Sequence, residues 1–148
     1  MVYTFINLLY VLLECLIMEK LMTLFEECRE ALKQDFTIVD DEQKAIELLQ
    51  TFPLKNNYMV WTNIDYKDYD CMEELLSDLL SLSASSFYVL ADSENVPIFK
   101  SNLKLVIENI DDVSALSSKV FIFDENVVIE PLFPTYTLRV GQKVLAVN

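Results

Sequence analysis

The stretch VWTNIDYKDYDCMEELLSDLLSL, residues 60–82, decides the fold, because it holds the clearest helix pattern next to a strand pattern. Residues 59–64 mix β-branched and aromatic side chains, which predicts a short strand. Residues 65–70 are predicted to form a turn, with Asp70 as N-cap of a helix and Glu73 completing an approximate capping box. Apolar residues then recur at three- and four-residue spacing, which predicts a buried stripe of Met72, Leu75, Leu76, Leu79 and Leu80.

Negative charge is concentrated in the middle of the chain. The 148 residues carry a formal charge of -13, and residues 61–99 hold eight acidic residues and one lysine, a local charge of -7. Residues 1–60 contribute -5 and residues 100–148 only -1. Such a surface repels DNA, RNA and anionic membrane, so we expect no direct nucleic-acid binding. The expected partner is a cation or a basic protein.

Composition excludes several kinds of site. The chain has no histidine, which rules out a histidine-ligated zinc, a Ser-His or Cys-His pair and a histidine general base. Gly141 is the only glycine, so no glycine-rich phosphate loop can form. No cofactor is expected. Cys15, Cys28 and Cys71 lack CxxC spacing, which favours three reduced, mostly buried cysteines in a cytoplasmic protein.

The first 17 residues are the most apolar part of the chain. They lack the positive n-region and the cleavage site of a signal peptide. A membrane span needs about 20 apolar residues, and Asn7 and Glu14 interrupt this run, so no span is expected. Residues 1–17 are therefore either a buried or partner-covered helix or an extension upstream of a start at Met18. The second interpretation is favoured, because an amphipathic helix begins at Met18.

Helices predominate early in the chain and strands late. The helix predicted for residues 18–34 has an inner face of Leu21, Met22, Phe25, Cys28 and Leu32. A second helix, capped by Asp40, ends at Pro53. The remaining predictions are strands at 87–90, 96–99 and 136–140, a short helix at 111–118, and a hairpin at 119–130. Residues 103–110 fit either a helix or a strand, and their β-branched content and the alternation at positions 103, 105 and 107 favour a strand. This order predicts one α+β domain over residues 1–148, with N-terminal helices packed on a mostly antiparallel sheet.

The candidate site is the group of carboxylates and tyrosines in residues 65–78. The group lacks the glycine and oxygen spacing of a calcium loop, and nothing selects two of its acids as a catalytic pair, so we predict no metal ligand and no catalytic residue. It is either a solvated helix face or a partner-binding surface. Exposed tyrosine beside carboxylate is suited to holding arginine and lysine. The predicted partner-binding residues are Asp65, Tyr66, Asp68, Tyr69, Asp70, Glu73, Glu74 and Asp78.

Three segments carry a resemblance to a known family: MEKLMTLFEECREALKQDF (18–36), VWTNID (60–65) and KVFIFDENVVIEP (119–131). In a small, acidic, histidine-free α+β chain they resemble the immunity proteins of bacterial contact-dependent growth inhibition, over roughly residues 18–140. The resemblance implies a non-enzymatic cytoplasmic protein that binds one cognate toxin domain, very often a basic nuclease, and blocks its active site.

Charge supports the same expectation independently, because an acidic surface speeds association with a basic toxin and can occupy a groove built for phosphates. The alternative is a regulatory or scaffold module that binds a host protein, or self-associates through residues 1–17. Association through that apolar segment should persist at high salt. An enzyme is the third choice, and it would have to work with carboxylates, tyrosine or cysteine alone.

Overall fold

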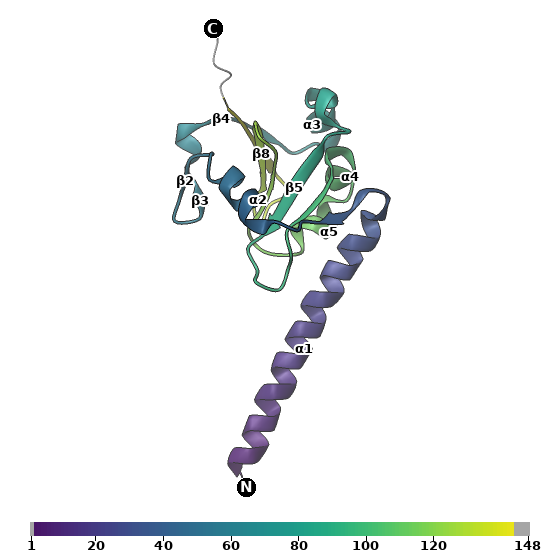
Figure 1. The fold of residues 1–148 in the computed structure, drawn as a ribbon, viewed down its shortest axis with the longest axis vertical. Coiled ribbons are helices and arrows are strands. Elements are labelled where there is room, and N and C mark those ends of the chain that lie inside the picture. The colour runs from purple at the N-terminus through teal and green to yellow at the C-terminus, as the bar shows by residue number, and fades with distance from the viewer. Residues whose placement is uncertain (1, 144–148) are drawn as a thin grey trace.

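The computed structural model describes the backbone of residues 2–143 and the side chains of residues 4–17 and 23–143. It confirms the α+β class, with a helical N-terminus and a seven-stranded antiparallel sheet (Figure 1). The helices are α1 (Val2–Ala31), α2 (Glu42–Leu49), α3 (Met72–Asp78), α4 (Leu103–Glu108) and α5 (Ile110–Ser114), with 3-10 turns at Lys33–Asp35, Trp61–Asn63 and Leu80–Leu82. The strands are β1 (Thr37–Ile38), β2 (Leu54–Lys55), β3 (Tyr58–Met59), β4 (Asp65–Tyr69), β5 (Ser86–Ala91), β6 (Phe99–Asn102), β7 (Val120–Phe123), β8 (Val127–Pro131) and β9 (Leu138–Gln142).

The sheet has the strand order β1-β6-β5-β7-β8-β9-β4. The predicted hairpin at 119–130 is confirmed as β7–β8, in which Phe123 lies opposite Val128. A separate small hairpin pairs β2 with β3. Strand β4 lies at one edge of the large sheet and, among the strands of residues 2–143, pairs with β9 alone. The charged middle of the chain is therefore an edge strand.

Apolar side chains are buried on both faces of the sheet. One face packs against the end of α1 and against α3, α4 and α5, and Ile122 and Ile129 belong to that cluster. The other face packs against α2 and the β2–β3 hairpin, where Phe123 and Val128 are fully buried. Successive residues of a strand point to opposite faces, so a strand covered on both sides is apolar at every position. Strand β7, with the sequence VFIF, has this pattern.

Helix α1 is one continuous helix of 30 residues, longer than the helix predicted to begin at Met18. Phe25 and Cys28 in its last turns, and Leu32 directly after it, join the core as predicted, whereas the side chains of Leu21 and Met22 lie outside the described residues. The side chains of residues 4–17 are exposed, and this half of the helix projects from the domain (Figure 1). Burial of residues 4–17 in the core is therefore excluded. No helix among the described residues has the length and apolar character that a membrane crossing requires.

The predicted strand at 59–64 and the predicted turn at 65–70 are both wrong. Only Tyr58 and Met59 pair as a strand, Trp61–Asn63 form a 3-10 turn, and β4 occupies residues 65–69. A residue of β9, Gly141, explains why Trp61–Asn63 form a turn. A Cβ at Gly141 would be 2.8 Å from Trp61 Cζ3 and 3.0 Å from Ile64 Cδ1, so the missing side chain provides the space into which the turn packs. The charged residues that follow suit an edge strand, which is solvated along its free side.

The predicted strand at 103–110 is also wrong, because residues 103–108 form α4. The Asn102 side chain accepts a hydrogen bond from the Leu105 amide at 2.9 Å and caps the helix. Leu103, Val106 and Ile107 are buried at helical spacing, and this three- and four-residue periodicity outweighs the alternation at positions 103, 105 and 107. The helix predicted at 111–118 is confirmed as the shorter α5.

Candidate functional site

The residues predicted to bind a partner lie on β4 and α3, which we call the acidic rim: Asp65, Tyr66, Asp68, Tyr69, Asp70, Glu73, Glu74 and Asp78. Strand alternation divides the rim between the two faces of the sheet. Tyr66 and Asp68 lie opposite Gly141 and Arg139 on the face that carries Trp61. Lys67 and Tyr69 lie on the α3 face. The free edge of β4 joins the two halves.

On the Trp61 face, Arg139 is held by both a carboxylate and aromatic rings. Its guanidinium donates to Asp68 Oδ1 at 2.7 Å and to Asp68 Oδ2 at 3.0 Å. The same group lies 4.4 Å from the centroid of the Tyr66 ring, and Trp61 meets Tyr66 edge-on at 5.7 Å. The hydrogen bonds from Arg139 hold the pKa of Asp68 below its usual range. Asp68 is thus largely neutralised within the chain.

On the α3 face, Lys67 forms ion pairs with Glu74 at 3.2 Å and with Asp78 at 3.1 Å. The Tyr69 hydroxyl donates to Asp78 Oδ2 at 2.7 Å. Hydrogen bonds from Tyr69 and then from Lys67 lower the pKa of Asp78. Burial, followed by that hydrogen bond, raises the pKa of Tyr69 to about 12. These contacts fasten α3 to the edge strand.

Three details of β4 and α3 differ from prediction. Both tyrosines were expected to be exposed, but only Tyr66 is, with 49% of its surface accessible, whereas Tyr69 is buried at 5%. Tyr69 is buried because it belongs to a strand rather than a turn. The N-cap of α3 is Cys71, and the Asp70 carboxylate instead accepts a hydrogen bond from the Thr137 hydroxyl at 2.5 Å. The predicted stripe ends at Leu79, since Leu80 is 70% exposed.

The remaining acids of the rim are available to a partner. Among the described residues, no ion pair involves Asp65, Asp70 or Glu73, and all three are exposed. The rim carries six carboxylates and only Lys67 and Arg139 as cations, which leaves four net negative charges. Sequence reasoning missed Arg139, which joins the rim only through the register of β4 with β9. It is the one charged residue within LRVGQ, and that was the available signal.

Cysteines and carboxylates elsewhere in the described part of the chain are the other possible metal ligands. No group of three or more Cys, Asp or Glu side chains in the described part of the chain could hold a metal ion. Cys15 and Cys71 are free and exposed, which corrects the expectation of mostly buried cysteines, and Cys28 is free and buried. Burial, assisted by the charge of Asp112, raises the pKa of Cys28 to about 12, so this thiol stays protonated.

The exposed acidic edge of this small α+β fold is suited to contact with a basic protein surface. Comparison with protein-family models matches residues 22–141 to the family described as CdiI immunity protein, EcoliA0-like. The match spans most of the chain, so the chain belongs to this family of immunity proteins of contact-dependent growth inhibition. No curated protein matches it.

Membership of this family defines the general function of the chain. The chain is a toxin-neutralising immunity protein, and its partner is a cognate toxin of contact-dependent growth inhibition. The resemblance seen over residues 18–140 is confirmed. Immunity proteins of this kind generally have no enzymatic activity.

Proposed function

We propose that the chain neutralises a basic nuclease toxin by placing the acidic rim over the toxin's active site or substrate groove. The observation that supports this is the surplus of four negative charges on the rim. A nuclease binds phosphates through cationic side chains, and free carboxylates such as Asp65 and Glu73 complement the same side chains. The electrostatic field of the rim also speeds the encounter, which protects the cell when toxin arrives.

We propose further that the chain works as one domain in the cytoplasm, where a nuclease toxin meets its substrates, and that it catalyses nothing itself. Blockade requires only an interface, and the rim supplies charge and one exposed ring without an activated nucleophile. Reduced cysteines agree with this compartment, since Cys15, Cys28 and Cys71 are all free thiols.

The experiment is a charge-reversal double variant of the rim, Asp65→Lys and Glu73→Lys. These acids have no ion pair among the described residues, so their reversal disturbs the fold less than that of Asp68 or Glu74, which would repel Arg139 or Lys67. Association with the contact-dependent inhibition toxin of the same cells is measured by stopped flow at low salt. We expect the association rate to fall by about tenfold or more.

A matched control applies the same change in net charge elsewhere, in the exposed residues Asp40→Lys and Glu94→Lys. The control variant should associate faster than the rim variant and protect growing cells from induced toxin, whereas the rim variant should not. Equal slowing in both would assign the effect to net charge and contradict the role of the rim. In parallel, the toxin is incubated with tRNA and with duplex DNA, and failure to cleave either would contradict the nuclease part of the proposal.

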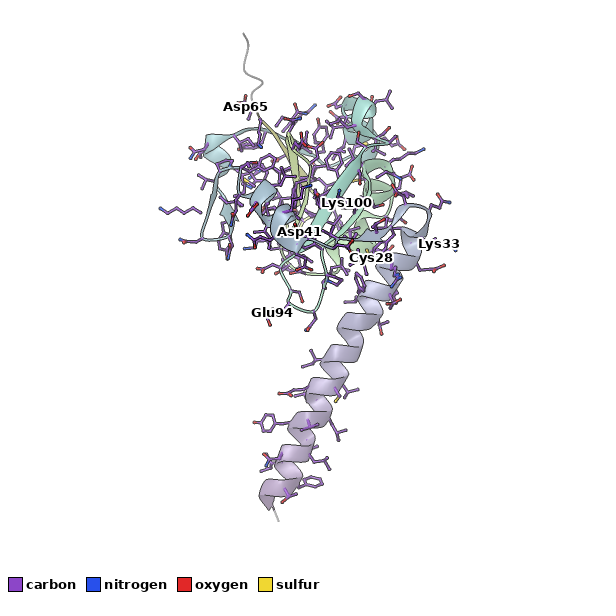
Figure 2. The ribbon with its side chains drawn as sticks, viewed as in Figure 1. Cys28, Lys33, Asp41, Asp65, Glu94 and Lys100 are labelled. Atoms are coloured by element: carbon purple, nitrogen blue, oxygen red, sulfur yellow. The ribbon has the colours of Figure 1, made fainter. Side chains whose placement is uncertain are left out.

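A second candidate function is a self-associating scaffold, and the specific observation behind it is the exposed half of α1. Ten large apolar side chains are 42–64% exposed there: Phe5, Ile6, Leu8, Leu9, Tyr10, Val11, Leu12, Leu13, Leu16 and Ile17. A helix that is apolar around most of its circumference is normally covered. Figure 2 shows these side chains projecting from the helix at the end of the molecule opposite Asp65, so the two surfaces can be tested separately.

The two functions differ in their dependence on salt. Assembly through α1 should persist at about 1 M salt, where exposed charges are screened within about 3 Å. It should be lost in a Leu9→Lys, Leu16→Lys variant, which places two charges on the same helical side. Sedimentation velocity of wild type and variant decides this: a wild-type monomer at both salt concentrations would contradict the scaffold function.

A further inference from the structure

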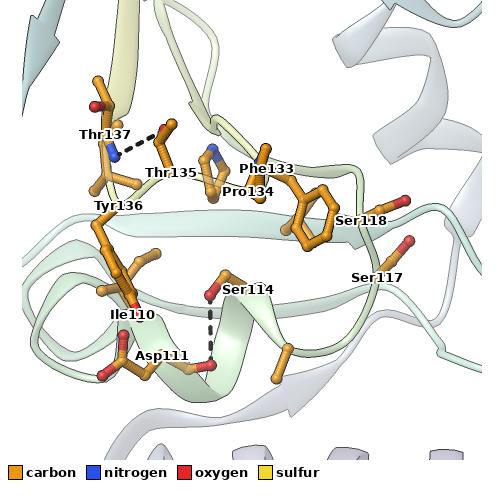
Figure 3. Close-up of a pocket in the computed structure, with 14 residues that line it drawn as sticks. Ile110, Asp111, Ser114, Ser117, Ser118, Phe133, Pro134, Thr135, Tyr136 and Thr137 are labelled. Carbon is orange, nitrogen blue, oxygen red and sulfur yellow. Dashed lines mark hydrogen bonds between the residues drawn. The ribbon is translucent and has the colours of Figure 1, made fainter.

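A groove lies beside the acidic rim, between α5 and the loop that joins β8 to β9 (Figure 3). Its volume is about 410 Å³, and the buried side chains of Val120 and Leu138 contribute to its lining. Asp111 and Ser114 of α5 form one wall. The other wall carries two aromatic residues of the loop, Phe133 and Tyr136, which are 74% and 87% exposed.

The loop that carries these rings is held in place by its own hydrogen bonds. The Leu132 amide donates to the Thr137 carbonyl at 2.9 Å and closes the base of the loop. The Thr135 amide and hydroxyl both donate to the Leu132 carbonyl, at 2.8 and 2.6 Å. An exposed aromatic residue on an ordered loop can bind a partner with little loss of conformational entropy, and such residues often dominate protein interfaces.

Carboxylates surround Tyr136. A second hollow, of about 380 Å³, continues from the groove toward the rim and is lined by Tyr136 together with Asp70, Glu108, Asp111 and Asp112. Glu108 has Lys104 at 3.8 Å. Among the described residues, no ion pair involves Asp70, Asp111 or Asp112, and no cation lies over the ring of Phe133 or Tyr136. The groove therefore offers negative charge and aromatic faces together.

Among the described residues, a cation lies over a tyrosine ring while it pairs with a carboxylate in three places, and the three cations are Lys67, Lys119 and Arg139. Arg139 lies over the Tyr66 ring while it donates two hydrogen bonds to the Asp68 carboxylate. A guanidinium suits such a site because it stacks on an aromatic face and donates in its own plane at the same time. Tyr136 and Asp111 line the same groove and offer the same two groups, with no arginine of the described chain beside them.

We propose that this groove is a second part of the toxin-binding surface, and that it receives an arginine-bearing segment of the toxin. The guanidinium stacks on Tyr136 and pairs with Asp111, while the aliphatic part of the segment lies against Phe133. This inference rests on the proposed function, since it extends the binding surface of the rim. The hydrogen bond between Asp70 and Thr137 joins the rim to the base of the loop, so one basic partner can contact both.

The test measures dissociation of the complex between the full chain and the contact-dependent inhibition toxin domain of the same cells. Tyr136→Ala and Asp111→Asn should each raise the dissociation rate about tenfold or more, and Tyr136→Phe should keep the wild-type rate because the ring is retained. The matched controls are Tyr58→Ala, which removes another exposed ring, and Asp40→Asn. Both should dissociate within about twofold of wild type.

The occupant is identified by replacing each arginine of the toxin domain with glutamine in turn. One replacement should raise the dissociation rate in the wild-type complex but add little when Tyr136→Ala is already present. If Tyr136→Ala and Asp111→Asn dissociate at the wild-type rate, the groove is not part of the binding surface, and the role of the rim is unaffected. If the effect of every arginine replacement adds fully to that of Tyr136→Ala, the groove does not bind an arginine. A wild-type chain that fails to bind the toxin would instead overturn the proposed function itself.

Discussion

Arg139 on β9 donates two hydrogen bonds to the Asp68 carboxylate on β4, from Nε at 2.7 Å and from Nη2 at 3.0 Å. The two residues are direct cross-strand partners, and among the described strands only β9 pairs with β4. The pair therefore secures the edge strand to the sheet. Part of the negative charge of the acidic rim thus stabilises the fold and is not free to bind a partner.

Substitution of either member of this pair should lower the stability of the fold, by different amounts. Asp68→Asn removes one charge from a partly exposed pair and should lower the free energy of unfolding by about 0.5–1 kcal/mol. Arg139→Ala should lower it by about 1–2 kcal/mol, because the stacking on Tyr66 and the aliphatic packing are also lost. Urea unfolding at pH 7 measures both. Asp65→Asn, on the same strand, should change the value by less than about 0.5 kcal/mol, and a loss as large as that of Asp68→Asn would contradict this account.

Acid should weaken the fold through Asp68 and Asp78. The pKa of each lies below its usual range, from hydrogen bonds with Arg139 for Asp68 and with Tyr69 and then Lys67 for Asp78. In the unfolded chain an aspartate has a pKa of about 3.9. The stability from these two groups is therefore fully present above that pH and is lost as pH falls through the lower pKa values of the folded state.

Thermal unfolding of the wild type from pH 6 to pH 2 measures this dependence. The Asp68→Asn, Asp78→Asn double variant should be less stable at pH 6 and should lose less stability on acidification. Asp78→Asn keeps an oxygen acceptor for Tyr69, whereas Asp68→Asn also loses one of the two oxygens that accept from Arg139. The contribution of charge is therefore taken from the slope of stability against pH and not from the absolute stability. Parallel pH profiles for the two proteins would show that other carboxylates determine the acid response.

A methyl group at position 141 should disturb the packing behind the rim. A Cβ there would lie 2.8 Å from Trp61 Cζ3 and 3.3 Å from Val128 Cγ1, and the Trp61 ring is itself in contact with Tyr66. We expect Gly141→Ala to lower the free energy of unfolding by about 1–3 kcal/mol. In a Trp61→Leu background the same substitution should cost less, because the ring is gone. If Gly141→Ala lowered the free energy of unfolding equally in both backgrounds, the steric conflict would not involve Trp61.

The same contact shows why the strand near the rim could not be located from sequence. Local propensity favours a strand at residues 59–64, but the positions of Trp61 and Ile64 depend on a glycine some 80 residues later in the chain. Where the periodic pattern itself carried the information, the prediction is confirmed: Leu75 of α3, Leu79 at its C-cap and the apolar β7–β8 hairpin are buried as expected. Helix α4 required one further signal, the cap at Asn102.

For the site, composition identified the acids but not their pairing. The carboxylates of residues 65–78 do lie together, because β4 leads directly into α3. Which of them are neutralised depends on Arg139, and thus on strand register, which no local pattern reveals. The groove residues Phe133 and Tyr136 were missed for a related reason. Tyr136 was assigned to a strand by alternation, whereas β9 begins only at Leu138 and leaves the ring exposed.

Glu130 lies half-buried on β8, and its Oε2 atom is buried with no hydrogen-bond partner among the described residues. Burial raises the pKa of Glu130, and the charges of Lys119 and Arg139 offset this only in part. A carboxyl whose pKa is raised on folding contributes full stability below the unfolded pKa of about 4.3, and that contribution is lost as pH rises through the folded value. At neutral pH the ionised side chain therefore weakens the fold.

Glu130→Gln should accordingly raise the free energy of unfolding at pH 7 by about 1 kcal/mol, because desolvation of a charge exceeds the lost attraction to Lys119 and Arg139. The gain should shrink as pH falls toward 4, where the wild-type carboxyl is protonated in the folded state. Urea unfolding at both pH values measures the difference, with exposed Glu125→Gln as the matched control. A loss of stability at pH 7 would mean that attraction to the two cations outweighs burial, and that Glu130 belongs to the ion-pair network of the rim.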